Sequence, residues 1–146
     1  MNNDALNDEG RDLWNNKAAF WDNLHGDEGN TFHRTLVSPA VEKLLNLRAG
    51  ERVLDIGCGN GALARRLAAL GGQVTAVDFS AALIDLARQR KHDGAPIDYR
   101  VVDATDESAL RALGEGDYAA ITCTMALMDM PVITPLYRAV RALLAE

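Results

Sequence analysis

The sequence has few of the features that mark several protein classes. Its 146 residues include two cysteines, Cys58 and Cys123, and their separation matches neither a metal-binding nor a redox motif. We therefore expect free thiols and no metal site. No apolar run approaches the ~18–20 residues of a membrane-spanning helix. The acidic, polar first ten residues do not resemble a secretory signal, so a cytoplasmic protein without a membrane association is expected.

An excess of positive charge is also missing. Fifteen lysines and arginines stand against 21 aspartates and glutamates, which gives a formal net charge of −6. A protein that binds the phosphate backbone of nucleic acid needs a basic face, so this charge disfavours nucleic acid and leaves a small molecule as the expected partner. The apolar content of 48% is that of a globular domain with a core of its own.

Short apolar runs alternate with segments of helical period along most of the chain. Alternating strands and helices predict an α/β fold with a doubly wound, Rossmann-like parallel sheet. We expect residues 1–9 to be frayed, a helix over Arg11–Leu24, and a helix begun by Ser38 with Val41, Leu44, Leu45 and Leu47 as its buried stripe. The expected strands are Val53–Ile56, Gln73–Asp78, Ile97–Asp103 and Asp117–Met125, and the expected later helices are Ala62–Leu70, Ser80–Lys91, Asp106–Leu113 and Thr134–Ala145. Residues 1–50 then form a helical extension, and 51–146 form the sheet domain.

The stretch Arg52–Gly61, R-V-L-D-I-G-C-G-N-G, joins the first strand to a helix through three alternating glycines. A strand, a glycine turn and a helix open a nucleotide-binding βαβ unit. Glycines there adopt backbone angles closed to other residues, and they let a ligand lie directly on the main chain.

Three aspartates stand at the ends of the first three strands: Asp55, Asp78 and Asp103. Ligands of open α/β sheets bind outside these ends, so the three carboxylates should meet in one crevice. Asp78 lies 21 residues after Gly57, where such folds place the acid that binds ribose hydroxyls. Asp55 would repel a pyrophosphate, whereas a ligand with an ammonium and a sulfonium removes the conflict.

These motifs resemble those of the class I S-adenosylmethionine-dependent methyltransferases. V-L-D-I-G-C-G-N-G matches their first motif, V-T-A-V-D-F-S the second, V-V-D-A-T-D the third and Y-A-A-I-T-C-T-M-A-L-M-D-M-P the fourth. The resemblance covers residues 53–131. It implies S-adenosylmethionine as cofactor, S-adenosylhomocysteine as product, and a helical lid over the cofactor formed by the segment Arg11–Leu24.

The resemblance also implies a role for each matching residue. Asp55 would orient the amino-acid end of the cofactor, Asp78 would hold the ribose, and Asp103 would accept from the adenine amino group. The other implied contacts lie under the methionine part (Gly57, Cys58, Gly59 and Gly61), beside the adenine (Phe79, Ser80 and Ala104) and on the methyl side (Thr124 and Met125). Cys58 occupies a position usually filled by a small residue, so a nucleophilic role is not expected of it.

No catalytic constellation is recognisable in the sequence. The candidates for contacts with the acceptor or the lid are Trp14, Trp21, His25, His33, Arg34 and Asp129. Packing or turn roles are favoured for Trp14, Trp21, His25 and Asp129, whereas for His33 and Arg34 both a structural and a ligand-binding role stay open. The acceptor and its attacking atom are not predicted.

The family's sheet continues with three further strands that this sequence does not contain. We therefore expect a truncated, cofactor-binding portion, with an exposed apolar edge at Tyr118–Met125 that favours self-association through this strand or the last helix. Three functions remain open: a methyltransferase acting on a small molecule, a catalytically silent S-adenosylmethionine-binding scaffold, and, disfavoured by Asp55, an NAD(P)-linked oxidoreductase.

Overall fold

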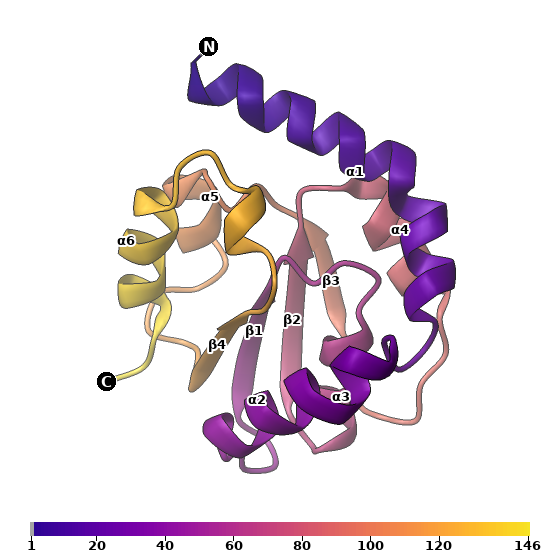
Figure 1. The fold of residues 1–146 in the computed structure, drawn as a ribbon. Helices are drawn as coiled ribbons and strands as arrows, with labels where there is room; N and C mark the ends of the chain where they lie inside the picture. The colour runs from indigo at the N-terminus through magenta and orange to yellow at the C-terminus, as the bar shows by residue number, and fades with distance from the viewer. Residues whose placement is uncertain (1) are drawn as a thin grey trace.

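A four-stranded parallel sheet forms the centre of the protein (Figure 1). It is seen in a computed structural model that describes residues 2–146. The strands are β1 (Arg52–Ile56), β2 (Gln73–Asp78), β3 (Asp98–Val101) and β4 (Ala120–Cys123), in the order β3-β2-β1-β4. The chain runs outward from β1 to β3 and then returns to the other side of β1. The predicted doubly wound α/β fold is confirmed.

Helices cover both faces of this sheet (Figure 1). Helices α3 (Ala62–Ala69) and α4 (Ala81–Gln89) pack with Val53 and Val74 on one face, while α5 (Glu107–Arg111) and α6 (Thr134–Leu143) pack with Leu54 and Ile56 on the other. Consecutive strand residues point to opposite faces. Because both faces are covered, all four strand residues 53–56 are buried, and neither face of β1 is exposed to solvent.

The N-terminal helix α1 (Asn3–His25) crosses above the ends of the strands (Figure 1). The expectation of a frayed start is wrong for residues 3–9, and Met1 lies outside the described residues. The helix begins early because the side chain of Asn2 caps it, accepting a hydrogen bond from the amide of Ala5 at 2.8 Å. No helix in the described part of the chain is long and apolar enough to cross a membrane.

A π-helix, η1 (His33–Val37), continues directly into α2 (Ser38–Leu45). The expected cap at Ser38 is wrong, because Val37 and Ser38 already have helical backbone angles and no side chain caps this junction. Leu44 was expected in the buried stripe of α2 but is 84% exposed, since the helix packs through the side that carries Val41, Leu45 and the following Leu47, all partly buried.

Strands β3 and β4 are shorter than the sequence predicts. After β3, the carboxylate of Asp103 accepts from the amide of Thr105 at 2.8 Å, which turns the chain away from the sheet. After β4, Met125 adopts a φ of 58°, which ends the extended conformation. The 3-10 helix η2 (Leu127–Asp129) then leads toward α6.

The edge beside β4 is partly covered by the chain itself. After α6, Leu144 pairs in parallel with Tyr118, whose amide donates to the Leu143 carbonyl at 3.1 Å and whose carbonyl accepts from the Ala145 amide at 2.9 Å. Tyr118 was expected on an exposed edge but is 1% exposed. No described strand pairs with the outer edge of β4 itself.

Candidate functional site

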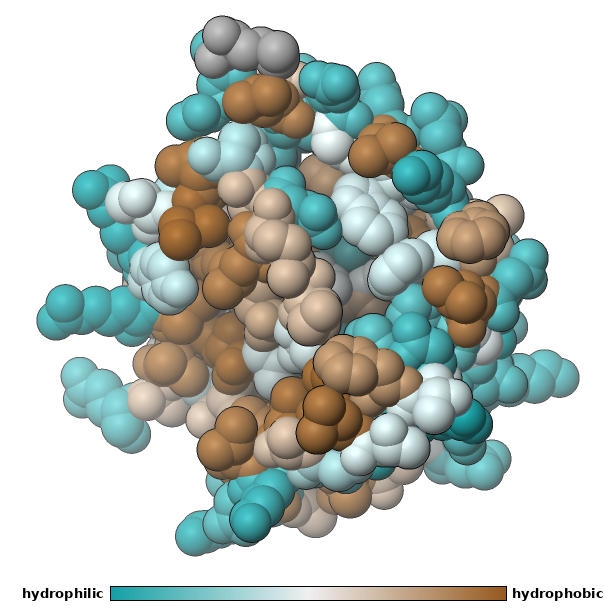
Figure 2. Space-filling model, in the orientation of Figure 1, coloured by the Kyte–Doolittle hydropathy of each residue, from teal (hydrophilic) through white to brown (hydrophobic). Residues whose placement is uncertain are grey.

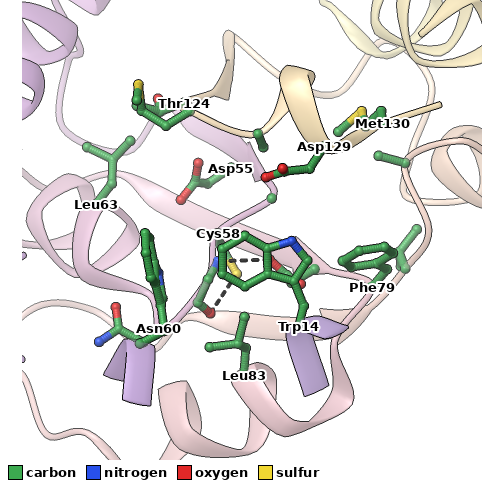
Figure 3. A pocket seen from close by; sticks show the side chains of 18 of the residues that line it. Trp14, Asp55, Cys58, Asn60, Leu63, Phe79, Leu83, Thr124, Asp129 and Met130 are labelled. Carbon is green, nitrogen blue, oxygen red and sulfur yellow. Dashed lines mark hydrogen bonds between the residues drawn. The ribbon is translucent and has the colours of Figure 1, made fainter. Parts of the chain in front are cut away.

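A cavity lies where the loops after all four strands meet beneath helix α1. Figure 3 shows Asp55, Asn60, Leu63, Thr124 and Asp129 around this space, with Trp14 of α1 among them. The wall thus combines residues from the β1, β2, β3 and β4 loops with residues from the N-terminal segment. This placement follows from the parallel sheet, because all strand ends lie at one edge.

The glycine loop after β1 is fixed to the neighbouring strand by its main chain. The amides of Gly57 and Cys58 both donate to the carbonyl of Val77, at 2.8 and 3.0 Å. Gly57 has a φ of 69°, and a Cβ built there would come within 2.6 Å of the Ala126 side chain. The loop therefore needs glycine for both its conformation and its close approach to the β4 loop.

Asp55 lies at the floor of the cavity and is 2% exposed. Its Oδ1 accepts from the Thr122 hydroxyl at 2.8 Å, but its buried Oδ2 has no hydrogen-bond partner among the described residues. Burial raises the pKa of Asp55 to about 7, the Thr122 hydrogen bond opposes this shift, and the negative charge of Asp78 adds to it. A buried carboxylate oxygen without a partner is costly, so this atom points to a ligand that donates or is positively charged.

Asp78 holds the glycine loop against the start of α4. Its Oδ2 accepts from the amide of Gly59 and its Oδ1 from that of Ser80, each at 2.9 Å. Burial raises the pKa of Asp78, and these two amides oppose the shift. A carboxylate has about four acceptor positions, so Asp78 keeps the capacity to accept two further hydrogen bonds.

Asp103, by contrast, is fully engaged within the protein. Its Oδ1 accepts from both the amide and the hydroxyl of Thr105, at 2.8 and 2.7 Å, while its Oδ2 accepts from Asn7 and Arg11 of α1, at 2.5 and 2.9 Å. Burial alone would raise the pKa of Asp103, but these hydrogen bonds outweigh it and lower the pKa. A new donor at Asp103 must displace one of the α1 side chains.

An aromatic row on α1 and η1 closes the cavity from above. The rings of Trp14 and Trp21 meet edge to face with their centroids 5.1 Å apart. The ring centroids of Trp21 and His25 are 4.2 Å apart, and those of His25 and His33 are 4.8 Å apart. All four line the cavity. The sequence favoured packing roles for Trp14 and Trp21 and a loop role for His25. These roles are incomplete, because the side of α1 that carries the three residues faces the strand ends.

Most residues singled out in the sequence meet in this one cavity. Those that line it are Asp55, Gly57, Cys58, Gly59, Asp78, Phe79, Asp103, Ala104, Thr124, Met125, Trp14, Trp21, His25, His33 and Asp129.

Three of the expected residues lie outside the lining. Gly61 instead makes room for Tyr99, whose hydroxyl oxygen would lie 2.3 Å from a Cβ built at Gly61. Ser80 is fully buried, with its hydroxyl bonded to Asn15 at 2.8 Å and to the amide of Leu83 at 3.2 Å. Arg34 points to the surface, within 3.9 Å of Glu28. Gly61, Ser80 and Arg34 are thus not among the residues that line the cavity, and the ligand contacts expected of them stay predictions.

Sequence reasoning missed several wall residues, of which Asn7 and Asn60 are the clearest. Asn60 lies within the glycine motif, and its side chain donates to Asp22 of α1 at 3.0 Å and to the carbonyl of Gly26 at 2.9 Å. An asparagine inside a glycine loop was a usable signal for a polar contact. Asn7 gave no such signal, because it lies in a stretch expected to be frayed.

The charge of the cavity is one-sided. Four carboxylates, those of Asp55, Asp78, Asp103 and Asp129, line it, and no lysine or arginine is among the described lining residues. Burial lowers the pKa of His25 and of His33, so these imidazoles do not supply a lasting positive charge at neutral pH. The cavity is therefore suited to a cationic ligand and unsuited to a pyrophosphate.

Comparison with known proteins agrees with this geometry. A family model described as a methyltransferase domain matches residues 53–146. The chain belongs to this methyltransferase domain family. The matched residues begin at β1 and include all four strands, α3–α6 and the glycine loop.

Curated relatives include the ubiquinone biosynthesis O-methyltransferases of Xanthomonas axonopodis pv. citri and Xanthomonas euvesicatoria pv. vesicatoria. They are 42% and 41% identical over 97 residues, which is 66% of this chain and 39% of each relative. The chain thus spans about two fifths of the length of the curated relatives it matches.

Solved structures share the fold of this methyltransferase domain at low sequence identity. The phosphoethanolamine N-methyltransferase 2 of Haemonchus contortus superposes with a TM-score of 0.76 at 23% identity, over 93% of this chain and 33% of that one. The magnesium protoporphyrin IX methyltransferase of Synechocystis superposes with a TM-score of 0.72 at 22% identity, over 95% of this chain and 72% of that one. Both similarities extend into α1, because the uncovered share of this chain is smaller than that helix.

Proposed function

We propose that this methyltransferase domain binds S-adenosylmethionine and transfers its methyl group to a small-molecule acceptor. The observation that carries the proposal is the unpartnered Oδ2 of Asp55, buried in a cavity lined by carboxylates. An α-ammonium group beside this oxygen would donate the missing hydrogen bond, and the negative field of the same carboxylates favours a sulfonium. The Haemonchus and Synechocystis neighbours, whose structures hold S-adenosylhomocysteine and S-adenosylmethionine, and the O-methyltransferase names of the relatives support it.

The proposed cofactor contacts follow the cavity wall. Gly57 and Gly59 lie beneath the methionine part, Asp78 accepts from the two ribose hydroxyls, and Phe79 and Ala104 flank the adenine. Asp78 has the acceptor capacity for this role, because only two of its positions are used. Asp103 can accept from the adenine amino group once Asn7 or Arg11 has moved away.

The protein's part in the reaction is alignment and exclusion of water. S-adenosylmethionine supplies a methyl group activated by its sulfonium, and an in-line displacement needs the nucleophile held opposite the sulfur. Thr124 and Met125 line the side proposed for the methyl group, and α1 covers the cavity. We treat residues 1–50 as the lid on the cofactor domain 51–146, and we place the reaction in the cytoplasm.

Calorimetric titration with S-adenosylmethionine, S-adenosylhomocysteine and NAD tests this proposal. We expect saturable binding of the first two and none of NAD. Binding of NAD alone would overturn the proposal. Binding of both S-adenosyl compounds, without transfer to any acceptor in a panel of phenols, amines and thiols, would favour a silent S-adenosylmethionine-binding scaffold.

Self-association is a second part of the proposal. Figure 2 shows apolar side chains gathered over the side of the molecule that carries β4 and α6. Met128 of η2 is 68% exposed and Tyr137 of α6 is 57% exposed, and the outer edge of β4 has no described partner strand. Together these features favour a homodimer through this side. Sedimentation as a monomer at all concentrations tested would contradict it.

A further inference from the structure

Two imidazoles stand in the cavity wall, and the proposed cofactor contacts do not use them. His25 ends α1 and His33 begins η1, with their ring centroids 4.8 Å apart and their planes at 72°. Trp21 continues the same wall, 4.2 Å from His25. The pair is thus built from two separate segments of the lid, which meet only in the folded protein.

Hydrogen bonds fix the tautomer of each ring. Nδ1 of His25 lies 3.2 Å from the Trp21 carbonyl, which can only accept, so this nitrogen carries the proton. Nδ1 of His33 lies 2.8 Å from Oδ1 of Asn30, and the same oxygen accepts from the His33 amide at 3.0 Å. The amide identifies that Asn30 atom as the oxygen. In both rings Nε2 therefore carries the free lone pair.

The surroundings keep both rings neutral. Burial lowers the pKa of His33, and the neighbouring His25 lowers it further; burial also lowers the pKa of His25, against the Trp21 carbonyl and Asp22. The other charged groups near this wall are Arg65, which donates to the carbonyls of Gly26 and Asp27, and Arg90, which pairs with Asp22 and Asp27. The surface pair of Glu28 and Arg34 lies on the same segment, and Asp55, Asp78, Asp103 and Asp129 lie across the cavity. A neutral imidazole with a lone pair is the form that takes a proton.

The two histidines differ in access. His25 is 6% exposed, and its Nε2 is buried without a partner, so an acceptor reaches it only if its neighbours move. His33 is partly exposed, lines the cavity, and has no described hydrogen-bond partner at Nε2. The accessible lone pair is therefore the one on His33, and Asn30 orients it in the way that a third group orients a catalytic base.

We propose that His33 Nε2 is the general base of the methyl transfer, and that the acceptor attacks through an atom that gives up a proton, which we assign to a hydroxyl oxygen. This inference rests on the proposed function. In the step, the hydroxyl proton goes to His33 Nε2, an oxygen lone pair forms the new bond to the methyl carbon, and the carbon–sulfur bonding pair leaves with the sulfur. Asn30 is a positioning residue that keeps the Nδ1 proton on the far side of the ring.

The chemistry of the wall narrows the acceptor further. A thioether or a tertiary amine attacks with a lone pair and has no proton to give, so a base would serve no purpose for it. The indole rings of Trp14 and Trp21 offer aromatic surface beside the histidines, and aromatic rings pack well against one another. A phenolic hydroxyl fits both features.

The test uses 4-nitrocatechol, a phenol whose ionisation is visible in its absorption spectrum, added to the protein with S-adenosylhomocysteine. We expect saturable binding and an ionisation midpoint about one pH unit below that of free 4-nitrocatechol, because the imidazole accepts the proton. His33→Gln should abolish this shift, and Asn30→Ala should reduce it. His92→Gln is the matched control, because His92 is outside the lining, and it should leave the shift unchanged.

Calorimetry with S-adenosylhomocysteine on the same samples separates the two proposals. Absence of S-adenosylhomocysteine binding overturns the proposed function. If S-adenosylhomocysteine binds, three results overturn the role of His33 alone. They are an unshifted midpoint, a shift that survives His33→Gln, and no saturable binding of 4-nitrocatechol. Circular dichroism reports whether His33→Gln is folded, and if it is not, Asn30→Ala carries the test, because it leaves the imidazole in place.

Discussion

Arg11 of α1 donates from Nη2 to Oδ2 of Asp103 across 2.9 Å, so the helix above the cavity is tied to the carboxylate at the end of β3. Asn7 donates to the same oxygen, and Asn15 is tied to the buried hydroxyl of Ser80. Helix α1, the proposed lid, is therefore held by the same strand ends that the proposed cofactor uses. Ligand binding and lid position should be coupled through these atoms.

Loss of the Arg11 contact should loosen the lid. In Arg11→Met we expect faster amide hydrogen exchange across the first half of α1, by about threefold to tenfold, because a partly exposed charged hydrogen bond contributes about 1 kcal/mol. Arg100→Met removes a more exposed ion pair, the one that Arg100 forms with Asp98 away from α1, and serves as the control. Exchange in α1 that is equal in both variants would show that Arg11 does not hold the helix.

Stability of the ligand-free protein should depend on Asp55. Its pKa is about 7 in the folded state, against an ordinary value of 3.8, so the folded protein holds this proton more tightly than the unfolded chain does. The free energy of unfolding should therefore fall as the pH rises from about 4 to 7. Scanning calorimetry on Asp55→Asn should show a flatter profile over this range than the unchanged protein, and an identical slope would contradict the raised pKa.

Cofactor affinity should depend on the ionised form of the same group. We expect the Kd for S-adenosylmethionine to rise as the pH falls below about 7, by up to tenfold per unit, because protonated Asp55 no longer attracts the α-ammonium. In Asp55→Asn the affinity should be weak and insensitive to pH. Titration calorimetry between pH 5.5 and 8 measures both, and a pH-independent Kd for the unchanged protein would place the ammonium elsewhere.

Removal of the Asp78 carboxylate should weaken S-adenosylmethionine binding by about 1–3 kcal/mol, the usual cost of losing a charged hydrogen-bond partner. Asp78→Ala also leaves the amides of Gly59 and Ser80 without their acceptor, so its melting temperature must be measured beside its affinity. Asp85→Ala, a change at an exposed aspartate on α4, should alter neither. Unchanged affinity in a folded Asp78→Ala protein would mean that the ribose lies elsewhere.

Gly61→Ala should destabilise the fold through Tyr99. A φ of 80° costs an alanine about 1 kcal/mol, and overlap of the new Cβ with the Tyr99 hydroxyl, 2.3 Å away, adds about 1–3 kcal/mol. Gly116→Ala has a similar φ of 70° and nothing within 4 Å, so urea unfolding of the two variants isolates the steric part. Tyr99→Phe should recover part of the loss in Gly61→Ala, because it removes the nearest atom.

Local sequence patterns determined the sheet and the floor of the cavity. The apolar runs, the glycine turn and the aspartates at the strand ends are set by residues close together in the chain. In a parallel sheet the ends of successive strands necessarily meet at one edge. For that reason the sequence alone predicts that Asp55, Asp78 and Asp103 meet in one crevice.

The roof of the cavity was decided only by the tertiary structure. Which side of an amphipathic helix faces the strand ends depends on how the helix docks, so the sequence could not show that Trp21, His25 and Asn7 line the cavity. It also could not show that the Ser80 hydroxyl donates to Asn15, since that hydrogen bond joins residues 65 positions apart. The local sequence thus determines where the carboxylates that favour a cation lie. The docking of α1 places His33, with its unbonded Nε2, in the wall of the same cavity.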